Sequence, residues 1–249
     1  MLDSMSIASA AMDGNQRVIN TIANNLANIN TTGYKKGRIE FSELVHAPEL
    51  SVNSTVRPTG GVESSEVLRD FSLGDLKQTA NPLHVAINGT GFFELVTEDG
   101  REIYSRRGDF TVDSEGYLVS QSGHYLSDMI KVPDQSDGLY IDSNGEVFAA
   151  LDGEQEFLGS IRVVSFTNVN GLEAVGDGEY IATDATGYTE LVDMSNSDDA
   201  LIQGYLEVSN VKMVDELTTM VLAQQAYGLN SRVVKISDEI LSMINNLTE

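Results

Sequence analysis

Apolar residues recur at alternating steps of four and three near the end of the chain. Between about Ser209 and Leu247, the positions in this row are Leu222, Ala226, Leu229, Val233, Ile236, Ile240, Met243 and Leu247. Such spacing is typical of one face of a helix that packs along another helix. No proline interrupts the stretch, and forty helical residues would extend about 60 Å. The pattern therefore predicts a long C-terminal helix whose apolar face, the C-terminal row, requires a partner.

The beginning of the chain carries a matching pattern, the N-terminal row. Its positions are Met5, Ala8, Met12, Asn15, Ile19, Ile22, Leu26 and Ile29, and Asn15 is the polar exception. A single Asn in such a row commonly fixes the register between helices. Gly33 follows, and we expect it to end the helix as a left-handed C′ residue. Either row alone would suit one helix capping an ordinary core. Two matching rows favour a hairpin of paired terminal helices.

The residues after the first helix lose this periodicity. Lys35, Lys36 and Arg38 form a small basic cluster, suited to hydrogen bonds with the last helix carbonyls. Residues 46–66 are rich in Ser, Thr, Pro and Gly. This composition predicts an extended connector or a long β-hairpin with little core of its own.

From Val85 to about Leu206 the period becomes two. Segments rich in β-branched and aromatic residues alternate with turn signals such as Ser114-Glu115-Gly116 and Asn144-Gly145. The short spacing between them predicts an antiparallel β domain, either a barrel or a sandwich. The predicted fold class is α+β. The expected parts are an N-terminal helix in 1–33, a connector in 34–84, a β domain in 85–206 and a C-terminal helix in 207–249.

Charge and composition exclude several classes of partner and site. The 249 residues carry a formal charge of −23, and residues 47–204 hold 8 basic and 28 acidic side chains. Nucleic acid and anionic membrane surfaces are therefore not expected partners. The chain has no cysteine, which excludes disulfides and thiolate metal sites. No apolar run approaches the length of a membrane-spanning helix. The first residues lack the pattern of a Sec signal peptide, so export would need another route.

Possible catalytic and metal-binding motifs have simpler explanations. Gly89 and Gly91 form a Gly-x-Gly followed by a strand, which favours a turn or bulge over a phosphate loop. Residues 113–116 and 142–146 each resemble part of a calcium loop but read more simply as hairpin turns. His46, His84 and His124 show no metal-ligand spacing. We predict no catalytic residues, metal ligands or cofactor, and no enzyme activity.

Three groups of motifs carry a resemblance to a known family. The first lies in Ile22-Ala23-Asn24-Asn25-Leu26-Ala27-Asn28-Ile29-Asn30-Thr31-Thr32-Gly33-Tyr34-Lys35. The second is Val85-Ala-Ile-Asn-Gly-Thr-Gly-Phe92-Phe93, with Arg106-Arg-Gly-Asp-Phe110 after it. The third is Leu206-Glu-Val-Ser-Asn210-Val211, followed by Gln225-Ala226-Tyr227 and Asn230-Ser231. Together they resemble the bacterial flagellar rod and hook proteins nearly end to end. Gly228 stands where that family more usually has a polar or acidic residue.

The resemblance implies a structural subunit of a helical tube. In such proteins the terminal helices form the inner wall around an export channel, the β domain faces outward, and the tube transmits torque. Length and C-terminal motifs are most similar to the distal-rod members, while a proximal rod or hook subunit stays open. The implied partners are further copies, neighbouring proximal rod and hook proteins, surrounding ring or bushing proteins and the flagellar type III export apparatus. The implied location is the basal body, where it crosses the periplasm and cell wall.

The two rows supply the expected assembly interface. We expect it to consist of Met5, Met12, Ile19, Ile22, Leu26, Ile29, Leu222, Leu229, Val233, Ile236, Ile240 and Leu247. A different class of protein also fits the composition: a secreted acidic adhesin or calcium-binding β module that trimerises through its ends. An enzyme housed in the β domain is a third possibility, although no constellation of residues supports it.

Overall fold

The computed structural model describes residues 2–44, 61–133, 136, 138–151, 154–194 and 200–247. The chain forms two compact units. The helical unit comprises residues 1–27, 37–69 and 212–249, and the β unit comprises residues 28–36 and 70–211. This division differs from the predicted one, because the predicted connector 34–84 is shared between the units. Its middle part packs with the helices, and both of its ends belong to the β unit.

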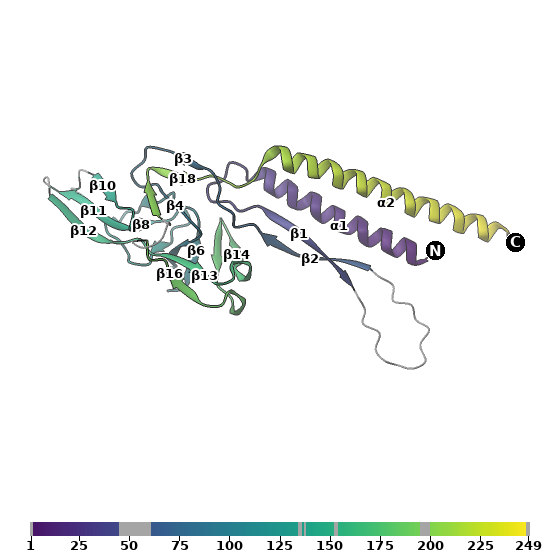
Figure 1. Cartoon of the computed structure of the whole chain (residues 1–249), viewed down its shortest axis with the longest axis horizontal. Helices are drawn as coiled ribbons and strands as arrows, with labels where there is room; N and C mark the ends of the chain where they lie inside the picture. The colour runs from purple at the N-terminus through teal and green to yellow at the C-terminus, as the bar shows by residue number, and fades with distance from the viewer. Residues whose placement is uncertain are drawn as a thin grey trace. The chain divides into compact units, whose positions relative to one another are not determined.

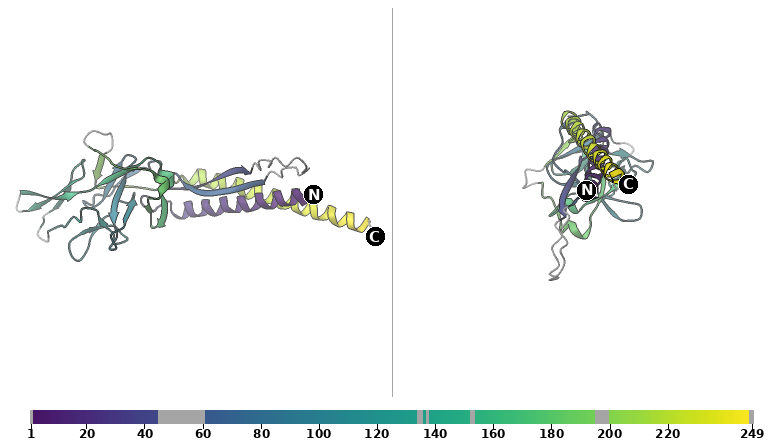
Figure 2. Two further views of the ribbon diagram at one scale, coloured as in Figure 1. Left: turned by 90° about the horizontal axis from the view of Figure 1, so that it is seen from below. Right: turned by 90° about the vertical axis from the view of Figure 1, so that its right-hand side faces the viewer.

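The helical unit contains both predicted terminal helices. Helix α1 (Leu2–Ala27) and helix α2 (Met213–Leu247) lie side by side and run in opposite directions (Figure 1). Views from two further sides show the same arrangement (Figure 2). Asp215 and Glu216 occupy the first turn of α2, where carboxylates interact favourably with the positive end of the helix dipole. Neither helix, within its described residues, is long and apolar enough to cross a membrane.

A β-hairpin completes the helical unit. Strands β1 (Gly37–Leu44) and β2 (Gly61–Arg69) pair antiparallel, with a bulge between Ile39 and Phe41. Both strands pack on α1. Within the predicted stretch 46–66, residues 61–66 belong to β2 of this hairpin, and the prediction for residues 46–60 falls outside the described residues.

Helix α1 ends about four residues earlier than predicted. It stops at Ala27, and residues 28–33 form turns in which Thr31 N donates to Asn28 O at 3.1 Å. Gly33 has the expected positive φ of 65°, but its N–H donates to Glu207 O at 2.8 Å instead of to a helix carbonyl. The prediction that Gly33 is the C′ residue is therefore wrong. Glycine is required there because a Cβ would lie 2.9 Å from the Arg106 and Arg107 backbone.

Gly33→Ala should lower the free energy of unfolding of the β unit by about 2 kcal/mol or more, from left-handed strain plus a backbone clash. Gly100→Ala is the matched control, because Gly100 has φ of 78° and open space around its Cβ position. In the control, the free energy of unfolding should fall by about 1 kcal/mol, from the left-handed backbone strain alone. Urea unfolding followed by tyrosine fluorescence measures both. Equal losses for the two variants would contradict the clash at Gly33.

The β unit is built of short antiparallel strands and two single-turn helices. They are β3 (Leu76–Gln78), β4 (Val85–Asn88), β5 (Phe92–Val96), β6 (Glu102–Ser105), β7 (Thr111–Val112), β8 (Leu118–Val119), β9 (Tyr125–Leu126), β10 (Gly138–Ile141), β11 (Glu146–Leu151), β12 (Glu154–Ser160), β13 (Val163–Phe166), η1 (Val169–Gly171), β14 (Glu173–Gly176), β15 (Glu179–Ile181), η2 (Asp184–Thr186), β16 (Thr189–Leu191), β17 (Ala200–Gln203) and β18 (Tyr205–Glu207). Antiparallel pairing throughout the described strands confirms the predicted strand class.

The largest sheet has nine described strands. Seven of them run in the order β14-β15-β6-β5-β9-β8-β7, and β13 pairs with both β5 and β16. A second sheet has the order β10-β11-β12, while β17 pairs with β4 and β18 with β3. The predicted hairpin turns are confirmed: Gly116 N donates to Asp113 O at 3.2 Å, and Gly145 N donates to Asp142 O at 3.0 Å.

Neighbouring aromatic residues of β5 pack into two separate cores. Phe93 belongs to a cluster that includes Leu95 and Leu126, and Phe92 belongs to one that includes Tyr104 and Phe166. Successive side chains of a strand point to opposite faces, so both faces of β5 are covered. Gly91 precedes them because a Cβ there would lie 2.2 Å from Val163 Cγ1. The motif residues Gly91, Phe92 and Phe93 are thus explained by packing.

Candidate assembly surface

The N-terminal row lies mostly inside the helical unit. Ala8 and Ile22 are buried, and Met5, Met12, Ile19 and Leu26 are half-buried. Ile29, the last member, is half-buried and belongs to the β unit. Most of this row therefore already has neighbours within a single chain.

The C-terminal row is exposed instead. Its large apolar members keep between 37% and 61% of their surface accessible; we call them the apolar stripe, which consists of Leu222, Leu229, Val233, Ile236, Ile240 and Met243. The Leu247 side chain lies outside what the structure describes. The prediction that the C-terminal row pairs with the N-terminal row is therefore wrong for one chain.

A different face of α2 packs on α1. Ala223 and Ser237 are buried, and Met220, Tyr227 and Val234 are half-buried. These positions also follow four-three spacing, about a third of a turn from the apolar stripe. The two buried positions, Ala223 and Ser237, carry small side chains, which allow the two helices to approach closely there. The large aliphatic side chains of the apolar stripe stay outside, where they are available for contacts with another molecule.

Asn25 joins three elements of the helical unit. Its Nδ2 donates to Gly37 O at 2.9 Å and to Glu216 Oε2 at 3.0 Å, and its Oδ1 accepts from Gly37 N at 2.9 Å. Gly37 begins β1, and Glu216 lies in the first turn of α2. The buried amide therefore satisfies backbone groups of β1 and holds the start of α2 against the end of α1.

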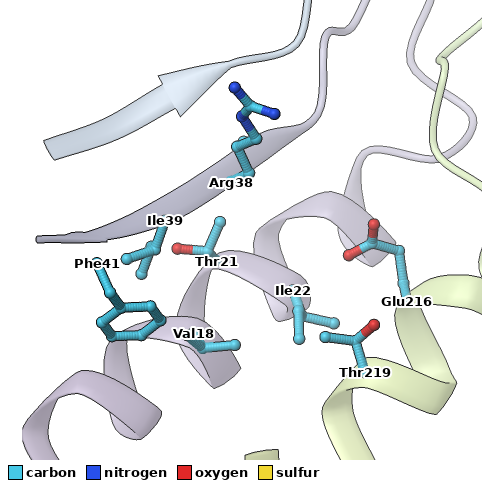
Figure 3. A pocket seen from close by; sticks show the side chains of 9 residues that line it. Val18, Thr21, Ile22, Arg38, Ile39, Phe41, Glu216 and Thr219 are labelled. Carbon is cyan, nitrogen blue, oxygen red and sulfur yellow. The ribbon is translucent and has the colours of Figure 1, made fainter. Parts of the chain in front are cut away.

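A cavity of about 250 Å³ opens next to this junction. Val18, Thr21 and Ile22 of α1 line one side. Strand β1 contributes Arg38, Ile39 and Phe41, and α2 contributes Glu216 and Thr219 (Figure 3). In the close-up, Ile22 of α1 and Thr219 of α2 point toward each other. The lining is mainly apolar with polar groups on α2 and β1, so an apolar side chain would fit it better than a charged one.

A buried ion cluster lies where the chain enters and leaves the β unit. Lys35 Nζ donates to Glu207 Oε1 at 2.6 Å and to Ser72 O at 2.7 Å. Both charged side chains are at most 1% exposed. Gly74 N also donates to Glu207 Oε1, at 2.8 Å, and Arg106 Nε lies 3.8 Å from Glu207 Oε2. Three segments distant in sequence thus meet at one carboxylate.

Opposing effects act on the charge of Lys35, and burial is the largest of them. Burial lowers the pKa of the Lys35 ammonium below its usual 10.5, the Glu207 carboxylate opposes that shift, and Arg106 adds to it. Arg106 also stacks over the Phe92 ring, at 5.4 Å from its centroid, and donates to Gly89 O. The predicted role of Lys35 at the end of α1 is therefore wrong, because Lys35 points into the β unit.

The remaining motif residues stabilise turns and chain crossings. Asn210 Oδ1 accepts from Lys36 N at 2.8 Å, and Asn210 Nδ2 donates to Asp70 O at 2.8 Å. Asn210 N donates to Tyr34 O at 3.4 Å. Asn28 Oδ1 accepts from Thr31 Oγ1 at 3.2 Å. Asn24 is exposed and Tyr227 half-buried.

Sequence reasoning missed Lys35, Glu207 and Arg106 as a group. All three lie inside the motifs that carry the resemblance. Their charges within these motifs are the signal from which a buried ion cluster could have been inferred. Gly228 stays unexplained within one chain, because a Cβ there would meet no atom within 4 Å.

The described residues contain no group of three or more His, Asp or Glu side chains arranged to hold a metal ion. The described surface instead carries two features suited to packing against another molecule. One is the apolar stripe on α2, and the other is the cavity beside the start of that helix, which has a mainly apolar lining.

Models of known protein families match three ranges of this chain. Residues 5–35 match the family model described as flagella basal body rod protein. Residues 86–149 match the flagellar hook protein FlgE/F/G D1 domain. Residues 202–247 match the flagellar basal body rod FlgEFG protein C-terminal model. The first range ends at Lys35, and the third includes Glu207 and the whole of α2.

Curated relatives match over nearly the full chain. The flagellar basal-body rod protein FlgG of Agrobacterium fabrum is 36% identical, over 97% of each chain. The FlgG proteins of Borreliella burgdorferi and Bacillus subtilis are 35% and 32% identical, each over 99% of both chains.

Proposed function

Because the chain belongs to the family of flagellar basal-body rod proteins FlgG, we propose that it is a structural subunit of the distal rod. It works in the flagellar basal body as part of a polymer. The apolar stripe of α2 is the observation that carries this function. A row of large aliphatic side chains left outside by its own chain supports contacts between copies.

Burial of the stripe supplies a driving force for polymerisation. About half of each side chain stays accessible in the single chain, so covering it would gain about 1 kcal/mol per residue. Head-to-tail contacts between different faces of identical copies generate helical filaments. Helices α1 and α2 would then pair in a coiled-coil-like hairpin whose outer face meets neighbouring hairpins and forms the wall of a tube.

The charge distribution supports an outward position for the β unit. Its sequence carries 8 basic and 26 acidic side chains, a net −18, while the helical unit has 7 and 12, a net −5. Close contacts between copies are less costly for the helical unit, which is less acidic, and the strongly acidic β unit is suited to solvent. The proposed neighbours are proximal rod and hook proteins and the surrounding rings, and the proposed export route is the flagellar type III apparatus.

A tag in the β unit tests the function. Gly123 lies in the exposed turn between β8 and β9, with open space around its Cβ position, so a short epitope there should leave the fold intact. We expect immunogold labelling of purified basal bodies to mark the distal rod, and cells lacking the chain to stop assembly before the hook. Label on the cell surface away from basal bodies, or normal flagella without the chain, would contradict the proposal.

A further inference from the structure

Helix α2 carries three groups of charged residues. Asp215 and Glu216 stand at its start, Arg232 and Lys235 follow sixteen to twenty residues later, and Asp238 and Glu239 come directly after them. Among the described residues, neither Arg232 nor Lys235 forms an ion pair. Arg232 directly precedes Val233, which is a member of the apolar stripe. Both basic side chains therefore stay available to an acidic group on another molecule.

Symmetry limits how such helices can meet. All copies in a helical polymer of one chain point the same way along its axis, so neighbouring α2 helices would be parallel. Without an axial offset, Asp215 would face Asp215 and Arg232 would face Arg232, which is repulsive. Two offsets put the basic pair beside acidic residues at 1.5 Å per residue: three to seven residues, about 5–10 Å, beside Asp238 and Glu239, or sixteen to twenty residues, about 24–30 Å, beside Asp215 and Glu216.

The larger offset also brings the apolar stripe to the cavity. Ile236 of the displaced copy would then lie level with Thr219, which lines the cavity between α1, β1 and α2. The cavity volume of about 250 Å³ leaves room for a large aliphatic side chain. The cavity and the stripe are different surfaces of one chain, and the copies are offset along the axis, so the contact between them does not close into a ring and can repeat.

On the basis of the proposed rod function, we infer that neighbouring copies pack α2 on α2 in parallel with an axial offset of about 24–30 Å. Arg232 and Lys235 of one copy face Asp215 and Glu216 of the next. The stripe residues Val233 and Ile236 of the first copy cover the cavity of the second. Exposed ion pairs add little to affinity, so the charges restrict the offset to two values, and burial of the stripe in the cavity favours the larger one.

Cysteine cross-linking tests the offset directly, because the chain has no cysteine of its own. Cells would co-express Thr219→Cys copies and Ile236→Cys copies, and isolated rods would be oxidised mildly. We expect disulfide-linked dimers on a non-reducing gel. The double variant should give a ladder of higher species. A bond within one chain is impossible, since the two positions lie about 25 Å apart on one helix.

The matched control mixes Thr219→Cys copies with Leu222→Cys copies, which would cross-link only at an offset of about three residues, the lower end of the smaller offset. Dimers in this control, or in neither mixture although both variants enter the rods, would overturn the inference. Absence of the chain from rods would overturn the proposed function instead, and the epitope-tagged chain distinguishes that outcome.

Charge exchange gives an independent test. Arg232→Glu with Lys235→Glu should reduce rod assembly at least about tenfold, because like charges then meet at the interface. Adding Asp215→Lys should restore part of it, because Glu216 stays acidic and a lysine interacts less favourably with the start of the helix. Asp215 is exposed and makes no side-chain bond in the described chain that this change would break. Equal assembly by all these variants would contradict the proposed charge pairing.

Discussion

Replacement of Glu207 by glutamine should lower the free energy of unfolding of the β unit by about 3–5 kcal/mol. The shape of the side chain is kept, but Lys35 and Arg106 lose the buried carboxylate between them. A buried ion pair adds little net stability, while removing one partner leaves charge that neither water nor a counter-charge compensates. Glu207 faces two cations, so replacing it should lower the free energy of unfolding more than replacing one of those cations does.

Lys35→Met is the informative comparison. It removes the donor to Glu207 Oε1 at 2.6 Å, yet Arg106 still lies 3.8 Å from Oε2 and Gly74 N still donates to the carboxylate. The loss should therefore be smaller, about 1–3 kcal/mol. Urea unfolding monitored by tyrosine fluorescence reports the β unit, which holds eight of the nine tyrosines. A loss for Lys35→Met equal to or above that for Glu207→Gln would contradict the central position of the carboxylate.

Local features of the fold could be predicted from the sequence because their causes are local. Strand alternation around Phe92 and Phe93 and the turns ending at Gly116 and Gly145 depend on neighbouring residues alone. The end of α1 could not be predicted in the same way. The Gly33 N–H bonds to Glu207, 174 positions further along the chain, and no pattern near Gly33 indicates that partner.

The face of α2 was mispredicted for a related reason. Periodicity identifies an apolar face but does not say which molecule covers it. In α2 the stronger row, with Leu229 and Ile236, stays exposed, and the weaker row, with Ala223 and Ser237, packs on α1. A single chain needs close helix approach within its own hairpin, while a polymer needs apolar area on the outside. The buried ion cluster has no periodic signature at all, since Lys35 and Glu207 are 172 positions apart.

Ile236→Asp should abolish rod assembly while leaving the single chain as stable as before. Ile236 is 55% exposed in one chain, so an aspartate there stays hydrated, and the free energy of unfolding should change by no more than about 0.5 kcal/mol. In the proposed contact the same carboxylate would be buried in an apolar environment, at a cost of several kcal/mol. That cost recurs at each copy added, so the polymer should not form.

Gln224→Asp is the matched control for added charge, because Gln224 is exposed on the same helix but lies outside the apolar stripe. Circular dichroism and urea unfolding of the purified chains measure folding, and electron microscopy of basal bodies measures assembly. Rods at the normal level with Ile236→Asp would refute the role of the stripe. An equal loss of rods with Gln224→Asp would show that negative charge on α2 is itself sufficient, and that burial of the stripe does not drive assembly.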